Sequence, residues 1–238
     1  MSRYARAFGD LLDALSLAMM AEFDHARAQW SEAHEVVTEL GDELHAAAST
    51  MQRGYIELLA GDFAAAEAIL AEGERDLERQ GEEGFRSTVQ CLRADALQGL
   101  GRTDDAIAAT ERAEGISFSD DFETMAGWRT ARARALADIG AHPNAERFAR
   151  AAIDIVEPTE SLDTQARAWT SLGYVLASAG RTDEALEAYG EALARLERKG
   201  NVPSSERVRS TIATLRGDHT AAASVSPGAW GSTWPRRS

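Results

Sequence analysis

The sequence predicts an all-α fold, a right-handed α-α superhelix of about five helix pairs followed by a C-terminal capping helix. The stretch GRTDDAI at Gly101–Ile107 returns as GRTDEAL at Gly180–Leu186. Aromatic residues make up only 7% of the chain and there are only 5 prolines, a composition that favours helix over strand. One alanine of the recurring stretch belongs to a column with spacings of 40, 40, 39 and 40 residues: Ala26, Ala66, Ala106, Ala145 and Ala185. Such a period is the signature of a repeat array.

Two further columns of small residues keep the same period. One lies twelve positions before each alanine and consists of Ala14, Gly54, Ala94, Ala133 and Gly173. The other lies five positions before each alanine and consists of Ala21, Gly61, Gly101, Gly140 and Gly180. We therefore interpret each unit as two antiparallel helices that approach closely where the small residues face each other.

The recurring stretch marks the turn inside one unit. The first helix is expected to end at the glycine, which adopts the left-handed conformation without steric cost. The second helix is expected to begin at once, with Thr103 or Thr182 as its N-cap. Acidic residues then follow in the first turn, where they face the positive end of the helix dipole.

These columns define the predicted domain organisation. We expect one helical repeat domain over residues 1–216, with units at about 7–45, 46–85, 86–124, 125–164 and 165–203 and a cap at 204–216. The tail 217–238 is rich in Gly, Ser, Ala and Pro without a period and is predicted to be disordered. The N-terminal end shows no cap in the sequence. Either the array is trimmed there, or it pairs with another chain through that end.

The fifth unit carries the residues of a known repeat family. AWTSLGYVLASAGRTDEALEAYGEALARL (Ala168–Leu196) resembles a tetratricopeptide repeat, with its signature positions at Trp169, Leu172, Gly173, Leu176, Ala185, Tyr189 and Ala192. The other units match the signature less well, and the 40-residue period exceeds the 34 residues of that motif. The resemblance implies a solenoid that binds proteins or peptides on its concave side.

A narrower resemblance covers roughly residues 47–216. The stretches GYIELLAGDFAAAE, STVQCLRADALQGLGRTDDAI and WRTARARALADIGAHPNAERFARAAI resemble the C-terminal repeat region of large bacterial signalling proteins. In that family a class III adenylate or guanylate cyclase domain and a P-loop ATPase domain precede the repeats. Nothing before Gly54 resembles either domain, so the resemblance implies an architecture and a signalling context without either activity.

Charge and cysteine content limit the possible partners. The formal net charge is -14, and residues 1–125 contain 26 acidic and 10 basic groups. Such a surface repels phosphate backbones, which argues against nucleic acid as a partner. Cys91 is the single cysteine, so no intramolecular disulfide can form, and the apolar run Leu11–Ala21 is too short to span a membrane. We therefore expect a cytoplasmic protein without a membrane partner.

No stretch shows a pattern typical of catalysis. Lys199 is the single lysine and is followed by Gly200, so a phosphate-binding Gly-Lys motif is ruled out. The five histidines have no metal-binding spacing, and Cys91 has no activating neighbour in the sequence. The sequence therefore predicts no enzyme, no cofactor and no metal site.

The remaining candidate is the concave groove, lined by the first helix of each unit. By analogy with tetratricopeptide arrays, the inward positions are Tyr55, Cys91, Asp95, Arg134, Arg167, Thr170 and Tyr174. Arg134 and Arg167 with Tyr174 suit an acidic peptide, because guanidinium binds carboxylate with two hydrogen bonds. The alternative is that these are ordinary solvated helix positions.

The function predicted from the sequence is a non-enzymatic protein- or peptide-binding scaffold, or a regulatory module, in bacterial signalling. The alternative is a fragment or shortened relative of a cyclase–ATPase regulator whose catalytic domains are absent from this chain.

Overall fold

The computed structural model describes residues 2–217, and all regular structure within them is helical, which confirms the predicted all-α class. Met1 and residues 218–238, which include all but the first residue of the predicted tail, lie outside the described residues. The helices are α1 (Arg3–Met19), α2 (Phe23–Glu39), α3 (Glu43–Ala48), α4 (Thr50–Ala60), α5 (Phe63–Arg79), α6 (Gly84–Gly99), α7 (Thr103–Ile116), α8 (Phe122–Asp138), α9 (His142–Val156), α10 (Leu162–Ser178), α11 (Thr182–Lys199) and α12 (Val202–Arg216).

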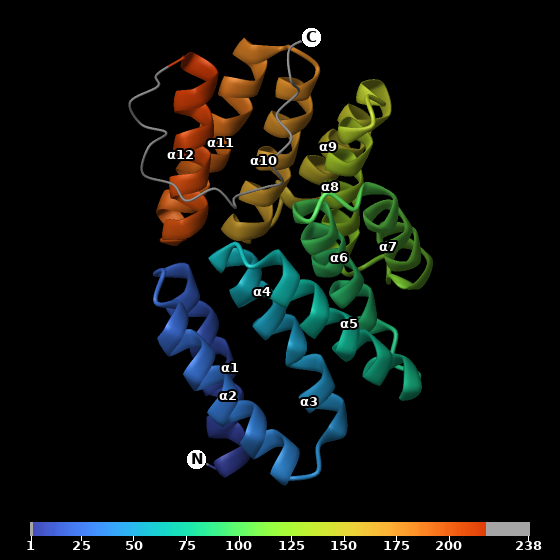
Figure 1. Cartoon of the computed structure of the whole chain (residues 1–238), viewed down its shortest axis with the longest axis vertical. Helices are drawn as coiled ribbons and strands as arrows, with labels where there is room; N and C mark the ends of the chain where they lie inside the picture. Colours follow the sequence, from blue (N-terminus) through green and yellow to red (C-terminus); the bar gives the residue numbers. More distant parts are fainter. Residues whose placement is uncertain (1, 218–238) are drawn as a thin grey trace.

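The helices pair and stack into a curved array (Figure 1). The pairs are α1–α2, α4–α5, α6–α7, α8–α9 and α10–α11, with α12 packed on α11. In Figure 1 the chain runs from α1 and α2 in blue, around the right-hand side, to α12 in red. The curvature is strong enough that α12 also contacts α1 and α4, so the two ends of the array meet.

The turn between the two helices of a unit has the predicted left-handed glycine. Gly61, Gly101, Gly140 and Gly180 have φ values of 81°, 73°, 78° and 77°. At Gly101 the turn is closed by two backbone hydrogen bonds, from Arg102 N to Leu97 O and from Gly101 N to Gln98 O, both 2.9 Å long. In the first unit the same place is taken by Ala21 with φ 66°, the one non-glycine residue with positive φ in residues 2–217.

The predicted threonine N-caps are wrong. Helix α7 begins at Thr103 and α11 at Thr182, so the cap positions belong to Arg102 and Arg181, and no side chain caps either helix. The physical reason is that the hydrogen bonds closing the glycine turn make the residue directly after the glycine the N-cap, and this residue is an arginine in both units. Each arginine instead binds an acid of the first turn: Arg102 Nε donates to Asp105 at 2.8 Å, and Arg181 Nε to Glu184 at 2.7 Å.

The other small-residue column lies at the predicted close contacts between paired helices. A Cβ added to Gly54 would lie 2.5 Å from Leu70, and one added to Gly173 would lie 2.9 Å from Tyr189. The three alanines of the column, Ala14, Ala94 and Ala133, are all 0% exposed. Helix spacing in each pair is therefore set by the absence of a larger side chain.

The second unit has a feature that the sequence did not predict: its first helix is broken at Ser49 into α3 and α4. The Ser49 hydroxyl donates to Ala46 O at 2.8 Å and the Thr50 hydroxyl to Ala47 O at 2.6 Å. Such bonds compete with the helical backbone and bend it. The Trp30 indole N–H also donates to Ser49 O, at 2.9 Å, which ties α2 to the bend.

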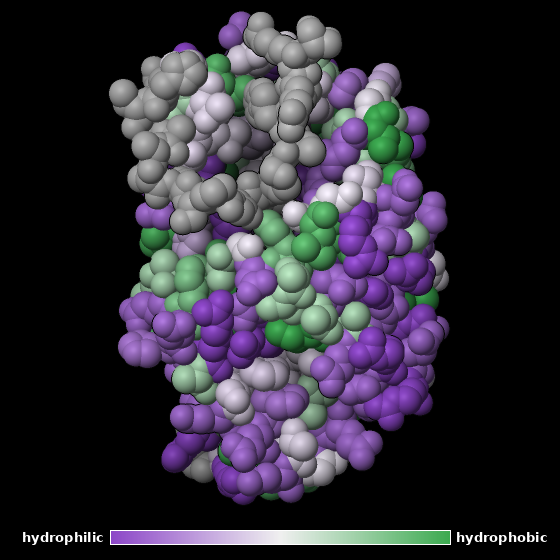
Figure 2. Space-filling view, viewed as in Figure 1, coloured by the Kyte–Doolittle hydropathy of each residue, from purple (hydrophilic) through white to green (hydrophobic). Residues whose placement is uncertain are grey.

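Hydrophilic residues cover most of the face shown in Figure 2, with hydrophobic residues gathered near its middle. Several large apolar side chains of the first unit are exposed, with Phe8 at 36%, Leu12 at 56% and Met20 at 52%.

Candidate functional site

A pocket of about 60 Å³ lies on the inner side of the array, and we call it the axial pocket. It is lined by residues from α4, α6, α8, α10, α11 and α12: Tyr55, Leu58, Leu59, Asp95, Arg134, Arg167, Thr170, Leu196, Ser204, Arg207 and Val208. Five of the seven predicted groove residues are among them, namely Tyr55, Asp95, Arg134, Arg167 and Thr170. The helical period thus places residues from four successive first helices around one cavity.

Asp95 is the centre of the charge network in this pocket. Its Oδ1 accepts a hydrogen bond from Arg134 Nη2, and its Oδ2 accepts one of 2.6 Å from Arg167 Nη2. Arg134 Nε also donates to Gln98 Oε1 at 2.7 Å. The side chains of Asp95 and Arg134 are only 4% and 3% exposed, whereas that of Arg167 is 27% exposed. Two buried charges are thus paired, and Arg167 presents the accessible edge of the network.

Contacts between distant units close the pocket. The Tyr55 hydroxyl on α4 donates to Asp163 Oδ2 on α10 at 2.6 Å, and Asn201 Nδ2 donates to Asp163 Oδ1 at 2.8 Å. Burial and the Asp163 carboxylate raise the pKa of Tyr55 well above its ordinary value, so the phenol stays a donor. Arg207 of α12 donates to Leu58 O at 3.1 Å and to Leu59 O at 2.9 Å, the carbonyls in the last turn of α4. The second unit is thereby fastened to the fifth.

The other two predicted residues lie outside the pocket lining. Cys91 is 3% exposed, its Sγ donates to Thr124 O at 3.7 Å, and burial raises the pKa of its thiol. A buried thiol with a raised pKa is a poor nucleophile. The Tyr174 hydroxyl donates to Asp138 Oδ1, and burial together with this carboxylate raises the pKa of Tyr174. Tyr174 therefore stabilises Asp138 and does not face the pocket with the arginines.

The arrangement limits what the arginines can do. Both Arg134 and Arg167 already bind the Asp95 carboxylate, so the carboxylate of a ligand would compete with Asp95 for the same guanidinium groups. Of the two arginines, Arg167 is the one that is partly exposed, at 27%, whereas Arg134 is 3% exposed. The predicted three-residue site of Arg134, Arg167 and Tyr174 therefore reduces to one accessible guanidinium.

Residues 166–195 match the family model for the tetratricopeptide repeat. These residues comprise most of α10 and α11, the pair in which Gly173 packs on Tyr189. No curated protein sequence matches the chain.

Solved structures with tetratricopeptide-type arrays share this fold. A Rap protein in complex with Competence and Sporulation Factor superposes with a TM-score of 0.69 at 14% identity, over 91% of this chain and 59% of that one. This chain thus spans less than two thirds of the Rap protein. Two structures of a Podosopora anserina putative kinesin light chain with nearly identical TPR-like repeats, one of them a single-substitution variant, give TM-scores of 0.57 and 0.56. Each is 16% identical over 84% of this chain, covering 98% and 99% of the other. The chain is therefore a tetratricopeptide-like solenoid.

The residues that close the pocket were missed by the sequence prediction. These residues are Arg207 on α12, Asp163 at the start of α10 and Asn201 just before α12. The partners that they bind are 38 to 149 residues away in the sequence. A repeat period predicts contacts between neighbouring units. It carries no signal for contacts across the turn of the superhelix.

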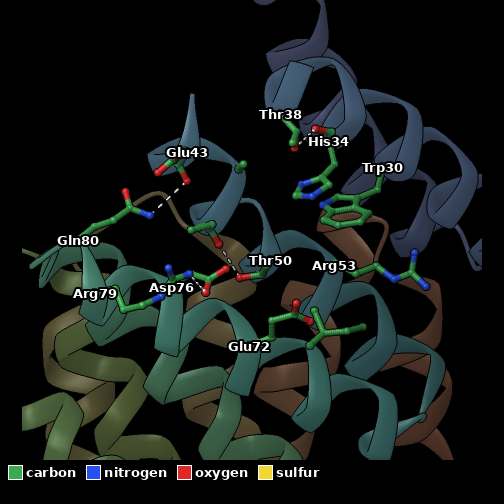
Figure 3. Close-up of a pocket in the computed structure, with 13 residues that line it drawn as sticks. Trp30, His34, Thr38, Glu43, Thr50, Arg53, Glu72, Asp76, Arg79 and Gln80 are labelled. Atoms are coloured by element: carbon green, nitrogen blue, oxygen red, sulfur yellow. Dashed lines mark hydrogen bonds and ion pairs between the residues drawn. The ribbon is translucent and has the colours of Figure 1, made fainter. Parts of the chain in front are cut away.

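A second and larger cavity, of about 600 Å³, lies between α2 and α5 (Figure 3), and we call it the α2–α5 cleft. It is lined by Trp30, His34, Thr38, Glu43, Ala46, Ala47, Thr50, Arg53, Ile69, Glu72, Asp76, Arg79 and Gln80. In the later units the second helix packs along the first helix of the next unit, as α5 does on α6. Helix α2 instead divides its contacts between α3 and α4, on the two sides of the Ser49 bend.

Within residues 2–217 there is no group of three or more His, Cys, Asp or Glu side chains placed to hold a metal ion. None of the helices in this range has the length and apolar character needed to cross a membrane.

Proposed function

We propose that the chain is a protein- or peptide-binding scaffold in bacterial signalling, and that an acidic group of its partner enters the axial pocket. The observation that carries the proposal is the partly exposed guanidinium of Arg167 in a pocket whose other walls are largely apolar. Pockets of this kind use few polar groups to fix a ligand and apolar surface to bind it. The Rap protein, a similar array in complex with Competence and Sporulation Factor, supports a binding role.

A partner carboxylate would bind the edge of Arg167 that Asp95 leaves open. Arginine has five N–H donors in a planar fork, so one guanidinium can serve two carboxylates. Leu58, Leu59 and Val208 would contact the apolar part of the same partner segment. Because the axial pocket is small, it suits one side chain or a chain terminus.

The test is capture of partners from a bacterial lysate, or of acidic peptides from an array, by purified wild-type and variant protein. We expect Arg167→Gln to lose the partners that wild type binds. Arg150→Gln, at an exposed arginine of α9, is the matched control and should retain them. An unchanged set of partners for Arg167→Gln, with an unchanged melting temperature, would remove the acidic-group proposal.

The signalling context rests on the sequence resemblance over residues 47–216. The same resemblance supports the second candidate, a piece of a cyclase–ATPase regulator, and the mass of the native protein or the reading frame upstream of Met1 distinguishes the two. A frame that continues upstream into a P-loop domain would favour the regulator. Purified chain that turns over ATP or GTP above background would contradict a role without catalysis.

We also propose that residues 1–216 act as one domain and that the array self-associates through its N-terminal end. The exposed side chains of Phe8 and Leu12 on α1 support this second point. Light scattering of the Phe8→Ser/Leu12→Ser variant tests it, since this change should shift any dimer to monomer.

A further inference from the structure

The α2–α5 cleft differs from the axial pocket in having carboxylates that no side chain binds directly. Glu72 on α5 and Glu43 on α3 line it, and neither carboxylate makes a hydrogen bond or an ion pair with another residue in 2–217. At longer range, the charge of Glu72 acts on His34 and that of Glu43 acts on Arg79. The two arginines of the lining are already engaged. Arg53 Nε donates to Glu57 at 2.8 Å, and Arg79 Nη2 donates to Asp76 at 2.6 Å. The remaining charge of the cleft is therefore negative.

The histidine of the cleft is held as an acceptor. The Ser49 hydroxyl donates its proton to Ala46 O, so it accepts from His34 Nδ1 at 2.8 Å. His34 Nε2 then keeps its lone pair. Burial lowers the pKa of His34, which keeps the ring neutral at neutral pH. The ring also stacks on Trp30, with centroids 4.5 Å apart, which fixes its orientation.

The cleft also has apolar surface beside these acceptors. Ala46, Ala47 and Ile69 are part of its lining. Figure 3 shows the Trp30 and His34 rings extending from α2 toward the space opposite Glu72. A cavity of about 600 Å³ lies within the range of ligand pockets, which is about 300–1,000 Å³. The shape suits a long side chain with an apolar stem and a charged end.

We propose that the α2–α5 cleft binds a basic segment of a partner protein, with an arginine side chain between His34 and Glu72. The guanidinium would donate to the Glu72 carboxylate and to His34 Nε2, and its methylene stem would lie on Ile69. Glu43 would attract a second basic residue at the rim. Charge complementarity selects this occupant: the lining contains the carboxylates of Glu43, Glu72 and Asp76 against the two guanidinium groups of Arg53 and Arg79, and residues 1–125 contain 26 acidic against 10 basic groups.

The experiment uses the full chain and two short fluorescein-labelled peptides, measured by fluorescence anisotropy. One peptide alternates arginine and leucine, and in the other citrulline replaces arginine, which keeps the shape and removes the charge. We expect the arginine peptide to bind at least tenfold more tightly than the citrulline peptide. The affinity should fall with rising salt, because ion pairs are screened.

The decisive variant is Glu43→Gln/Glu72→Gln, which should weaken arginine-peptide binding at least tenfold. The matched control is Glu111→Gln/Glu187→Gln, which removes the same charge from exposed positions on α7 and α11. Equal weakening by both pairs would mean unspecific attraction to an acidic surface and would overturn the proposal. So would equal binding of the two peptides, or no binding of either.

A second variant separates the cleft from a general charge effect. Glu72→Arg places a guanidinium where the ligand's would lie, so it should abolish binding of the arginine peptide. If instead the cleft variants convert a dimer of this chain to monomer in light scattering, the occupant is a second copy and the partner proposal is wrong. Neither outcome depends on Arg167, so this proposal and that for the axial pocket fail separately.

Discussion

The axial pocket and the α2–α5 cleft lie on two sides of the same helix, α4, yet their charges are arranged in opposite ways. In the axial pocket Asp95, Arg134 and Arg167 satisfy one another, and Arg207 and Tyr55 fasten α4 to α12 and α10. In the cleft Arg53 binds Glu57 and Arg79 binds Asp76, while the carboxylates of Glu43 and Glu72 form no hydrogen bond or ion pair with another residue in 2–217.

The difference teaches which charges stabilise the fold and which are available to a ligand. A buried ion pair is costly to break, because removal of one member leaves the other charged in a low-dielectric surrounding. An exposed carboxylate costs nothing to keep and can bind a partner without losing an internal contact. We therefore expect substitutions of the buried Asp95–Arg134 pair to change stability and substitutions of the cleft carboxylates to change binding alone.

The largest effect should come from Asp95→Asn. Because this change removes the carboxylate that both Arg134 and Arg167 bind, it should lower the free energy of unfolding by about 3–5 kcal/mol. The matched change Glu72→Gln in the cleft should alter it by less than about 0.5 kcal/mol. Urea denaturation followed by circular dichroism measures both. Equal losses for the two variants would contradict the distinction between the two cavities.

A smaller effect should come from Gly54→Ala on α4, the wall between the two cavities. The added Cβ would lie 2.5 Å from Leu70. Helices α4 and α5 must then separate, which should cost about 1–3 kcal/mol. Gly190→Ala on α11 is the control, since a Cβ there has no atom within 4 Å. It should be stabilising by about 0.5–1 kcal/mol, because alanine is favoured over glycine inside a helix. A Gly54→Ala variant as stable as wild type would show that α4 is free to shift.

The smallest effect should come from Ala21→Gly at the turn between α1 and α2 of the first unit. A left-handed alanine costs about 1–2 kcal/mol, and glycine returns about 0.4–1 kcal/mol of this as unfolded-state entropy. We expect a net gain of about 0.5 kcal/mol on these two figures. Thermal unfolding measures it, with Gly61→Ala as the reverse change at φ 81°. A loss of stability in Ala21→Gly would mean that the entropy gained by the unfolded chain outweighs the relief of strain at this turn.

Much of the fold could be predicted from the sequence because each unit repeats the same local physics. The glycines at 61, 101, 140 and 180 have the left-handed φ that the sequence predicted for them. The small-residue column lies at the helix contacts, as Gly54 on Leu70 shows. The threonine caps were predicted wrongly because the N-cap position depends on which hydrogen bonds close the preceding turn. The sequence does not show whether a threonine near that turn occupies the N-cap or the first position of the helix.

The periodicity of the sequence also brought Tyr55, Asp95 and Arg134 to one cavity, since each lies eleven positions before an alanine of the repeat column. The equivalent residue of the fifth unit is Tyr174, which lies outside the lining, and α10 instead contributes Arg167 and Thr170 from earlier turns. The sequence alone could not show that Asp95 would bind both arginines, because side-chain pairing depends on distances between helices. Contacts of Arg207 and Tyr55 across more than 100 residues exist only because the superhelix curves far enough for its ends to meet. The bend at Ser49, which borders the cleft, likewise depends on tertiary structure. The Ser49 hydroxyl competes with the backbone for a hydrogen bond, and Trp30 and His34 of α2 also bind Ser49. The repeat in the sequence thus determined the helices and the direction of their faces, whereas the curvature of the whole array decided which charges are paired and which remain open to a ligand.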